Sequence, residues 1–289
     1  MGYRHPVARE GTSVEAHLRF CRDVIAALLV SGLAVALLAG CGAGAEGDGG
    51  EQGRTLTVFA ASSLTDAFGV LAKSFEEQNP GTEVRQTFES SSTLLTQIQQ
   101  GAPADVFASA AEEEMNTAVD DGLVAGEPEI FARNREVVMV PIDNPANIKS
   151  LRDLARPGTK LVLAQEGVPA ADYALEILGK ADAQYGGNFE QQVLSNVVSR
   201  EADVRASVSR VALGDADATF GYASDYTPDI RDRVRVIEVP ENLNIIATYP
   251  IAALKGAENA ELAQKWVDLV LSDEGQRVLE RWGFEPVIR

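Results

Sequence analysis

Apolar segments with the length of β-strands alternate with amphipathic helical segments along most of this chain. The strand-like segments at residues 56–60, 161–164 and 197–199 are each followed by a helical pattern. Strands separated by helices usually pair in parallel, because the helix returns the chain to the same edge of the sheet. The pattern therefore predicts a mixed, largely parallel α/β protein, in which ligands gather beyond the carboxyl ends of the strands.

The first strand-helix unit has a turn suited to an anion. After the strand at residues 56–60, Ser62 and Ser63 leave little side-chain bulk, and Ser63 and Asp66 have the spacing of a capping box. Apolar residues then recur every three or four positions over residues 64–75, as in an amphipathic helix. Hydroxyls and free amides at a helix start can bind an anion, although the same residues can also serve only as caps.

Polar turns recur at the ends of later strands. A strand at residues 83–89 ends in Ser90, Ser91, Ser92 and Thr93. This is more hydroxyl than one cap requires, although a solvated turn would have the same composition. Further polar turns contain Pro169-Ala170, Asp203-Val204 and Tyr222 to Asp225, and Arg205 is the one cation in or beside them. We therefore expect a site built from hydroxyl and amide donors.

Three consecutive acids, Glu112, Glu113 and Glu114, open a predicted helix. Carboxylates in a row can suggest a metal site or acid-base chemistry. Acids in the first turn also complement the helix dipole and keep a surface soluble. We favour this second interpretation.

The 289 residues suffice for two domains of ordinary size, and the composition is that of a globular protein. The formal net charge is -18 without a Lys/Arg cluster, so nucleic acids and anionic membrane surfaces are poor partners. His5, His17 and Cys21 precede a predicted cleavage site, which leaves Cys41 as the one Cys of the mature chain and no His. A Cys/His zinc site, a Ser-His-Asp or Cys-His nucleophile and an internal disulfide are thereby excluded.

The N-terminal segment has the features of a secretory signal. Arg19 and Arg22 precede an apolar run at residues 24–38, which is short for a membrane span, and Leu-Ala-Gly-Cys ends at Cys41. This resembles the bacterial lipoprotein signal, which implies cleavage just before Cys41, removal of residues 1–40 as the signal peptide, and lipidation of Cys41. The alternatives are a plain signal peptide or a membrane anchor. Glycine-rich, acidic residues continue to residue 53, so we expect residues 41–53 to be a flexible tether.

The later chain resembles the molybdate-binding proteins of bacterial ABC importers, which are type II periplasmic binding proteins. The resemblance rests on VFAASSLTDAF at residues 58–68 and ESSSTLLTQIQQGAPADVFASA at residues 89–110. VPAADYA, EADVRASVSRV and GYASD follow further along the chain. The resemblance implies two α/β lobes with a ligand cleft between them, with residues 54–133 plus 248–289 in lobe 1 and residues 134–247 in lobe 2. The chain would cross between lobes near Asn134 and return near Thr248.

The resemblance also implies the ligand contacts. They are the hydroxyls and amides of Ser63 and Ser91, the amides of Ala170 and Val204, and the hydroxyl of Tyr222. A direct metal-ion ligand, a catalytic residue and a cofactor are not implied. Tyr222 could instead be an ordinary buried aromatic residue. Asp172 stands close to the implied site, where a carboxylate would repel an anion, and we expect it to complement its own helix dipole.

The function implied by the resemblance is capture of molybdate by a monomeric, extracytoplasmic lipoprotein at the outer face of the cell membrane. The protein would deliver its ligand to an ABC permease driven by an ATPase. Tungstate shares the charge and shape of molybdate and remains open as a ligand. The alternatives are binding of another oxyanion, such as sulfate or phosphate, and an enzyme that uses Ser63 or Ser91 as nucleophile. A serine enzyme would lack a His base.

Overall fold

The computed structural model describes residues 54–287. The predicted signal peptide at residues 1–40, the predicted lipidation of Cys41 and the tether at residues 41–53 lie outside these residues. Within them, helices long and apolar enough to cross a membrane are absent.

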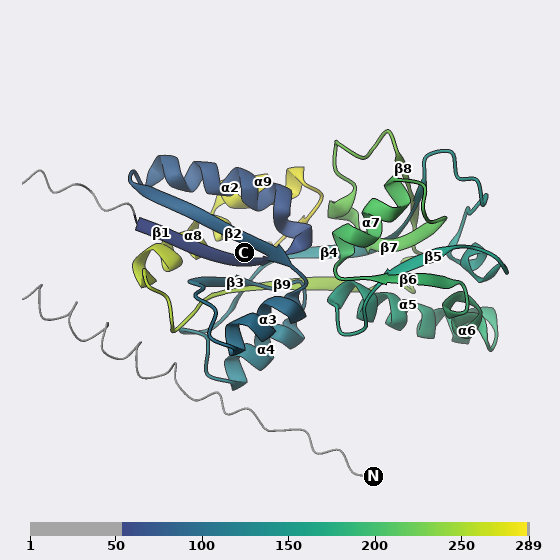
Figure 1. Cartoon of the computed structure of the whole chain (residues 1–289), viewed down its shortest axis with the longest axis horizontal. Helices are drawn as coiled ribbons and strands as arrows, with labels where there is room; N and C mark the ends of the chain where they lie inside the picture. Colours follow the sequence, from purple (N-terminus) through teal and green to yellow (C-terminus); the bar gives the residue numbers. More distant parts are fainter. Residues whose placement is uncertain (1–53, 288–289) are drawn as a thin grey trace, which may run out of the picture. The chain divides into compact units, whose positions relative to one another are not determined.

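The described elements follow one another as strands and helices along the chain (Figure 1). The strands are β1 (Arg54–Ala61), β2 (Thr82–Glu89), β3 (Val106–Ala108), β4 (Glu129–Pro141), β5 (Leu161–Ala164), β6 (Val197–Glu201), β7 (Ala218–Tyr222), β8 (Val234–Glu238), β9 (Ile246–Ala253) and β10 (Glu285–Pro286). The α-helices are α2 (Thr65–Gln78), α3 (Ser91–Gln99), α4 (Glu112–Asp120), α5 (Pro169–Tyr185), α6 (Phe189–Leu194), α7 (Val204–Ala212), α8 (Ala260–Leu271) and α9 (Asp273–Arg281). Short 3-10 helices are η1 (Ser62–Leu64), η2 (Leu151–Ala155) and η3 (Ala223–Asp225).

The described strands form one mixed sheet. Its order is β2-β1-β3-β9-β4-β7-β5-β6, and β8 and β10 also pair with β4. β1 is parallel to β2 and β3, and β5 is parallel to β6 and β7, whereas β4 and β9 are antiparallel to their neighbours. The prediction of a mixed α/β protein is confirmed.

The long strands β4 and β9 connect two lobes (Figure 1). We call lobe 1 the part formed by β1, β2, β3, β10, α2, α3, α4, α8 and α9, and lobe 2 the part formed by β5 to β8 and α5 to α7. In β4, Arg133 lies opposite Thr248 and Asn134 opposite Ala247 of β9. From Glu136 onward, the same strand pairs with β7 and β8 of lobe 2. Two adjacent strands therefore carry the chain between the lobes.

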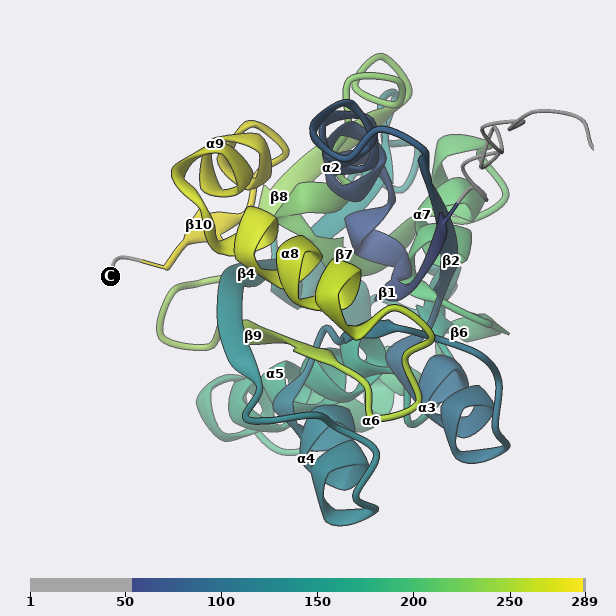
Figure 2. The same ribbon diagram turned by 90° about the vertical axis from the view of Figure 1, so that its left-hand side faces the viewer.

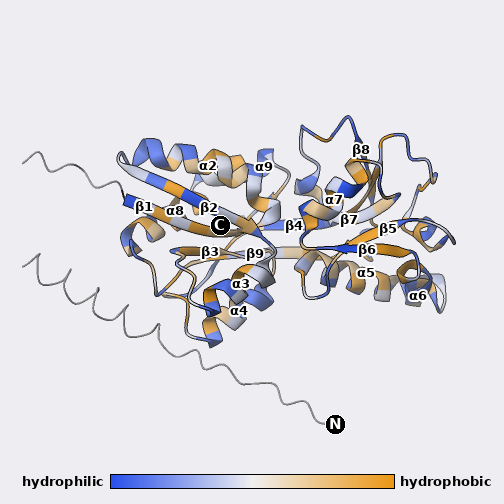
Figure 3. Ribbon diagram, viewed as in Figure 1, coloured by the Kyte–Doolittle hydropathy of each residue, from blue (hydrophilic) through white to orange (hydrophobic). Residues whose placement is uncertain are grey.

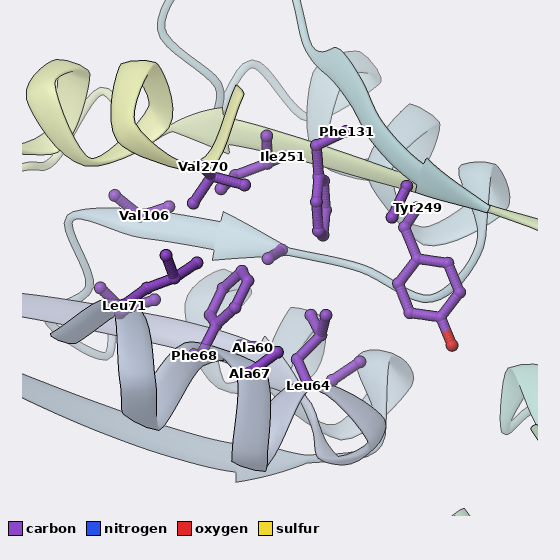
Figure 4. Packing of buried hydrophobic residues seen from close by; sticks show 14 of the residues in the cluster. Ala60, Leu64, Ala67, Phe68, Leu71, Val106, Phe131, Tyr249, Ile251 and Val270 are labelled. Carbon is purple, nitrogen blue, oxygen red and sulfur yellow. The ribbon is translucent and has the colours of Figure 1, made fainter. Parts of the chain in front are cut away.

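Aromatic side chains fill the core of lobe 1. The ring of Phe68 on α2 lies 5.5 Å from that of Trp266 on α8 and 5.8 Å from that of Phe131 on β4. Figure 4 shows Phe68 and Phe131 within this cluster, with the phenol oxygen of Tyr249 pointing out of it. Helix α9 packs beside α8 and α2 (Figure 2). Burial of these rings holds helix α2 against the sheet and so fixes the position of its first turn, which follows β1.

Lobe 2 is built around α5, whose apolar face covers the sheet. Ala174, Ile177, Leu178 and Ala181 recur at helical spacing and are fully buried. They share a hydrophobic cluster with buried residues of β4, β5 and β7. Figure 3 shows the resulting contrast between the hydrophobic strand β5 and helices with one polar face. Burial of the α5 face fixes the N-terminus of this helix against the crossing strands.

The predicted capping box of Ser63 and Asp66 is wrong. The chain forms η1 at Ser62–Leu64, and α2 begins at Thr65 without a side-chain cap hydrogen bond. The Ser63 hydroxyl lies instead 3.0 Å from the Tyr249 hydroxyl, and the Asp66 carboxylate contacts Arg205. Both side chains are taken by partners far away in sequence, so neither is free to cap the helix.

Candidate functional site

A small cavity lies where the two lobes meet. The space open to the centre of a water-sized sphere is about 10 Å³, and the cavity is lined by Ala61, Ser62, Ser63, Glu89, Ser90, Ser91, Ala110, Val168, Pro169, Ala170, Val204 and Tyr222. All of the predicted ligand contacts, Ser63, Ser91, Ala170, Val204 and Tyr222, are among these residues. One water molecule needs about 10 to 15 Å³ of such space, so the cavity excludes drug-sized ligands and has room for only a very small group.

Ser63 lies in η1, directly after the carboxyl end of β1. Its side chain is buried, and its hydroxyl is 3.0 Å from the hydroxyl of Tyr249 on β9. A hydroxyl can donate one hydrogen bond and accept others. When Tyr249 donates to Ser63, the Ser63 hydrogen remains available for a ligand in the cavity.

Ser91 is the first residue of α3, after the carboxyl end of β2. The preceding Ser90 caps the helix, because its hydroxyl accepts a hydrogen bond from the Thr93 amide at 3.1 Å. The Ser91 hydroxyl accepts a hydrogen bond from the Ala110 amide at 2.9 Å. Cap and site are thus separate residues, and the Ser91 hydroxyl is oriented so that its own hydrogen can be donated to a ligand.

Ala170 and Val204 bring the first turns of two helices to the cavity. Ala170 follows Pro169 at the start of α5, and Val204 is the first residue of α7. Amides in a first helical turn have no acceptor within the helix, and the helix dipole is positive there. Asp203 caps α7 through the Ala206 amide at 3.0 Å, which leaves the Val204 amide to the cavity. Both helices therefore favour a negatively charged ligand.

Tyr222 ends β7 and is buried, with 1% of its surface exposed. Within residues 54–287, its hydroxyl has no hydrogen-bond partner. Burial raises the pKa of Tyr222 well above its ordinary value, and the nearby Tyr249 and Glu136 add to the shift. The phenol is therefore a neutral donor at physiological pH. A buried donor without a protein partner is expected where a ligand supplies the acceptor.

The cavity wall contains one carboxylate, Glu89, but no Lys or Arg. Arg205 lies next to Val204 in sequence, but Asp66 and Asp225 pair with its guanidinium. Attraction for an anion must therefore come from neutral hydroxyls, amides and helix dipoles.

The acids that open α4 belong to a separate pocket. Glu112, Glu113 and Glu114 lie in the first turn of this helix, as expected for residues that complement its dipole. Together with Asp172, they line a neighbouring pocket. The Asp172 carboxylate accepts a hydrogen bond from the Gly167 amide at 3.1 Å and is absent from the wall of the cavity between the lobes. In the described part of the chain, groups of three or more His, Cys, Asp or Glu residues arranged for a metal ion are absent.

Two residues near the cavity were not identified from the sequence. Tyr249 lies within an apolar segment, which gives no sign that its hydroxyl faces a site residue. Glu136 begins the part of β4 that enters lobe 2 and lies opposite Tyr222 in the sheet register. Its side chain is fully buried, and its carboxylate has no hydrogen-bond partner within residues 54–287. In the sequence, Glu136 follows the polar residues Asn134 and Arg135 and precedes an apolar run, as an exposed residue at the start of a strand would.

The chain is similar to known proteins of one family. Residues 56–285 match the family model described as bacterial extracellular solute-binding protein. The molybdate-binding protein ModA of Mycobacterium tuberculosis is 37% identical over 260 residues, which span 89% of this chain and 95% of that protein.

Solved structures confirm the two-lobed fold. The periplasmic molybdate-binding protein of Azotobacter vinelandii matches with a TM-score of 0.69 and 17% identity, over 81% of this chain and 100% of that chain. The sulfate-binding protein SubI of Mycobacterium tuberculosis matches with a TM-score of 0.73 and 19% identity, over 81% of this chain and 87% of that chain. At these identities the structures show the fold alone. With the family model matched over nearly all of the described residues, the chain belongs to the bacterial extracellular solute-binding proteins.

Proposed function

We propose that this protein binds molybdate in the cavity between its lobes and delivers it to the permease of an ABC transporter. The observation that carries the proposal is the convergence of the Ser63, Ser91 and Tyr222 hydroxyls with two helix starts around a cavity without cations. The relative with 37% identity is a molybdate-binding protein, which supports the same ligand here.

The donor set also favours an oxyanion without protons. Molybdate is a tetrahedral dianion at neutral pH, so each of its oxygens accepts hydrogen bonds. Hydrogen phosphate carries a proton, which would face other donors in this cavity. An unpaired buried donor costs about 1 to 3 kcal/mol. Sulfate satisfies the same donors, so its discrimination from molybdate depends on the size of the closed cavity.

Tungstate has the same charge and shape as molybdate, and we propose it as a second ligand. We propose no catalytic role for Ser63 or Ser91, because His is absent from residues 42–289. A serine nucleophile normally requires a neighbouring base. Binding and release then constitute the whole function.

We further propose that the protein is a monomer attached to the outer face of the cell membrane through lipid on Cys41. Residues 1–40 would be the cleaved signal, and residues 41–53 the tether. The proposed lobe boundaries are residues 54–133 plus 248–289 and residues 134–247. Closure would then bend the chain at β4 and β9, as in hinged binding proteins.

Thermal unfolding of the purified protein tests the ligand. Molybdate, tungstate, sulfate and phosphate would each be added at the same concentration. A ligand present at about a hundred times its dissociation constant stabilises the folded state by about 2.7 kcal/mol, which raises the midpoint by several degrees. A shift with molybdate and tungstate alone supports the proposal. A shift with sulfate or phosphate instead would replace the ligand, and no shift with any of them would contradict oxyanion binding.

A further inference from the structure

An ion-pair chain connects the two lobes beside the cavity. Arg205, the second residue of α7, lies between Asp225 of η3 and Asp66 of α2. Its Nε is 3.2 Å from Asp225 Oδ1, and its Nη2 contacts Asp66 Oδ2. Asp66 belongs to lobe 1, whereas Arg205 and Asp225 belong to lobe 2. Among the described ion pairs, this one joins a helix of lobe 1 to a helix of lobe 2.

Each of the three ion-paired residues is close in sequence, or hydrogen-bonded, to a residue that lines the cavity. Arg205 follows Val204, and Asp66 lies three residues after Ser63. The Asp225 carboxylate accepts a hydrogen bond from the Tyr222 amide at 3.0 Å. The ion pairs and the ligand donors therefore occupy the same turns, and any movement of the lobes that separates the donors also separates Asp66 from Arg205.

The two ion pairs of Arg205 differ in location: one lies within lobe 2, and the other joins the two lobes. Asp225 is fully buried within lobe 2 and attracts the guanidinium by its charge, although Arg205 Nε and Asp225 Oδ1 make no hydrogen bond within residues 54–287. Asp66 keeps 32% of its side-chain surface exposed, and its pair with Arg205 spans the two lobes. Burial lowers the pKa of Arg205, but the two carboxylates raise it by more, so the guanidinium stays charged. Lobe 2 therefore presents the charged guanidinium of Arg205 to the Asp66 carboxylate of lobe 1.

We propose that Arg205 is a positioning residue that latches the closed lobes through Asp66 and slows release of the bound oxyanion. This inference rests on the proposed function, because a latch matters only when the lobes close over a ligand. An interaction made only in the closed form shifts the open-closed equilibrium toward that form. The latch should therefore act mainly on the dissociation rate.

Asp66→Ala separates the latch from simple electrostatics by the sign of its effect. Removing a carboxylate near an anion site reduces repulsion, which alone would tighten binding. Loss of the latch predicts the opposite, a dissociation rate about two- to fivefold higher, in the range for a partly exposed ion pair. Arg205→Ala is a poor test, because it would leave Asp225 buried without its counter-charge.

The experiment is a chase of labelled molybdate from the purified protein with excess unlabelled molybdate, at low and high salt. Glu261→Ala is the matched control, because it removes an exposed carboxylate whose pair with Lys265 lies within α8 of lobe 1. We expect faster release from Asp66→Ala only, with a smaller salt dependence than in the wild type, and unchanged thermal stability without ligand. Equal or slower release from Asp66→Ala would overturn the latch alone. Absence of molybdate binding by the wild type would overturn the proposed function, and the latch with it.

Discussion

The hydroxyls of Ser63 and Tyr249 lie 3.0 Å apart and join the first binding turn to the crossing strand β9. Tyr249 is fully buried between aromatic neighbours, with its ring 5.8 Å from that of Tyr222 and 6.1 Å from that of Phe131. The strand that connects the lobes therefore also orients the hydroxyl of Ser63, which we propose as a ligand donor. Movement at the crossing strands should change the position of the Ser63 hydroxyl.

Loss of either site serine should weaken binding. Ser63→Ala and Ser91→Ala each remove one donor to the ligand, which should raise the dissociation constant for molybdate by roughly 10- to 100-fold. Ser92→Ala is the control, because Ser92 is adjacent to Ser91 in α3 but does not line the cavity. Titration calorimetry measures all three constants. Equal affinities for Ser91→Ala and Ser92→Ala would contradict the site.

Tyr222→Phe should have opposite effects on binding and stability. The variant keeps the ring but loses a buried hydroxyl that has no partner within residues 54–287. Without ligand, we expect stability equal to or above that of the wild type, because no hydrogen bond within the described residues is lost. With molybdate, we expect about tenfold weaker binding. Unfolding and calorimetry on the same samples test both, and unchanged affinity would exclude Tyr222 from the site.

Tyr249→Phe tests the orienting role of the Ser63–Tyr249 pair. Tyr249 does not line the cavity, so removal of its hydroxyl should affect binding mainly through its hydrogen-bond partner Ser63. We expect a weaker effect than that of Ser63→Ala and no further loss in the double variant, because coupled residues are not additive. A double-mutant cycle measured by calorimetry gives this coupling. Full additivity would show that the two hydroxyls act independently.

The sequence predicted the turns better than their internal contacts. Strand-helix alternation and runs of hydroxyls are local patterns, so the turns that contain Ser63, Ser91, Ala170 and Val204 could be found without a structure, and the family resemblance singled out these residues within the turns. The partners of those residues could not. Asp66 was read as a cap because its local spacing fits one, whereas its partner Arg205 is 139 positions away. Tyr249 lies in an apolar segment, and its partner Ser63 is 186 positions away, so the local sequence does not indicate the contact.

Glu136 should lower the stability of the folded protein at neutral and alkaline pH. Burial raises the pKa of this carboxyl well above its ordinary value, and Asp225 adds to the shift. The stabilising, protonated state is fully present below the pKa in the unfolded chain and is lost as pH rises through the higher pKa in the folded chain. Glu136→Leu should therefore stabilise the protein by roughly 1 to 3 kcal/mol at pH 8, and by less near pH 5. Denaturant unfolding at both pH values measures the difference, and a destabilised variant at pH 8 would contradict this assignment.

Glu114 should make stability fall between about pH 5 and pH 8. Burial raises the pKa of this carboxyl to about 7, and Glu113 and Asp172 add to the shift. Its contribution is complete below the ordinary value of 4.5 and disappears as pH rises through about 7. Relative to wild type, Glu114→Gln should gain roughly 2 kcal/mol of stability from pH 5 to pH 8. Denaturant unfolding of both proteins at pH 5 and pH 8 measures this gain. An equal difference in the free energy of unfolding between variant and wild type at the two pH values would contradict the raised pKa of Glu114.

The most direct measurement is a crystal structure of the protein grown with molybdate, with data collected at the molybdenum absorption edge. We expect one anomalous peak in the cavity between the lobes, with ligand oxygens within hydrogen-bond distance of the Ser63, Ser91 and Tyr222 hydroxyls. The Ala170 and Val204 amides should complete the shell. Anomalous density outside this cavity, or a filled cavity without these contacts, would contradict the account.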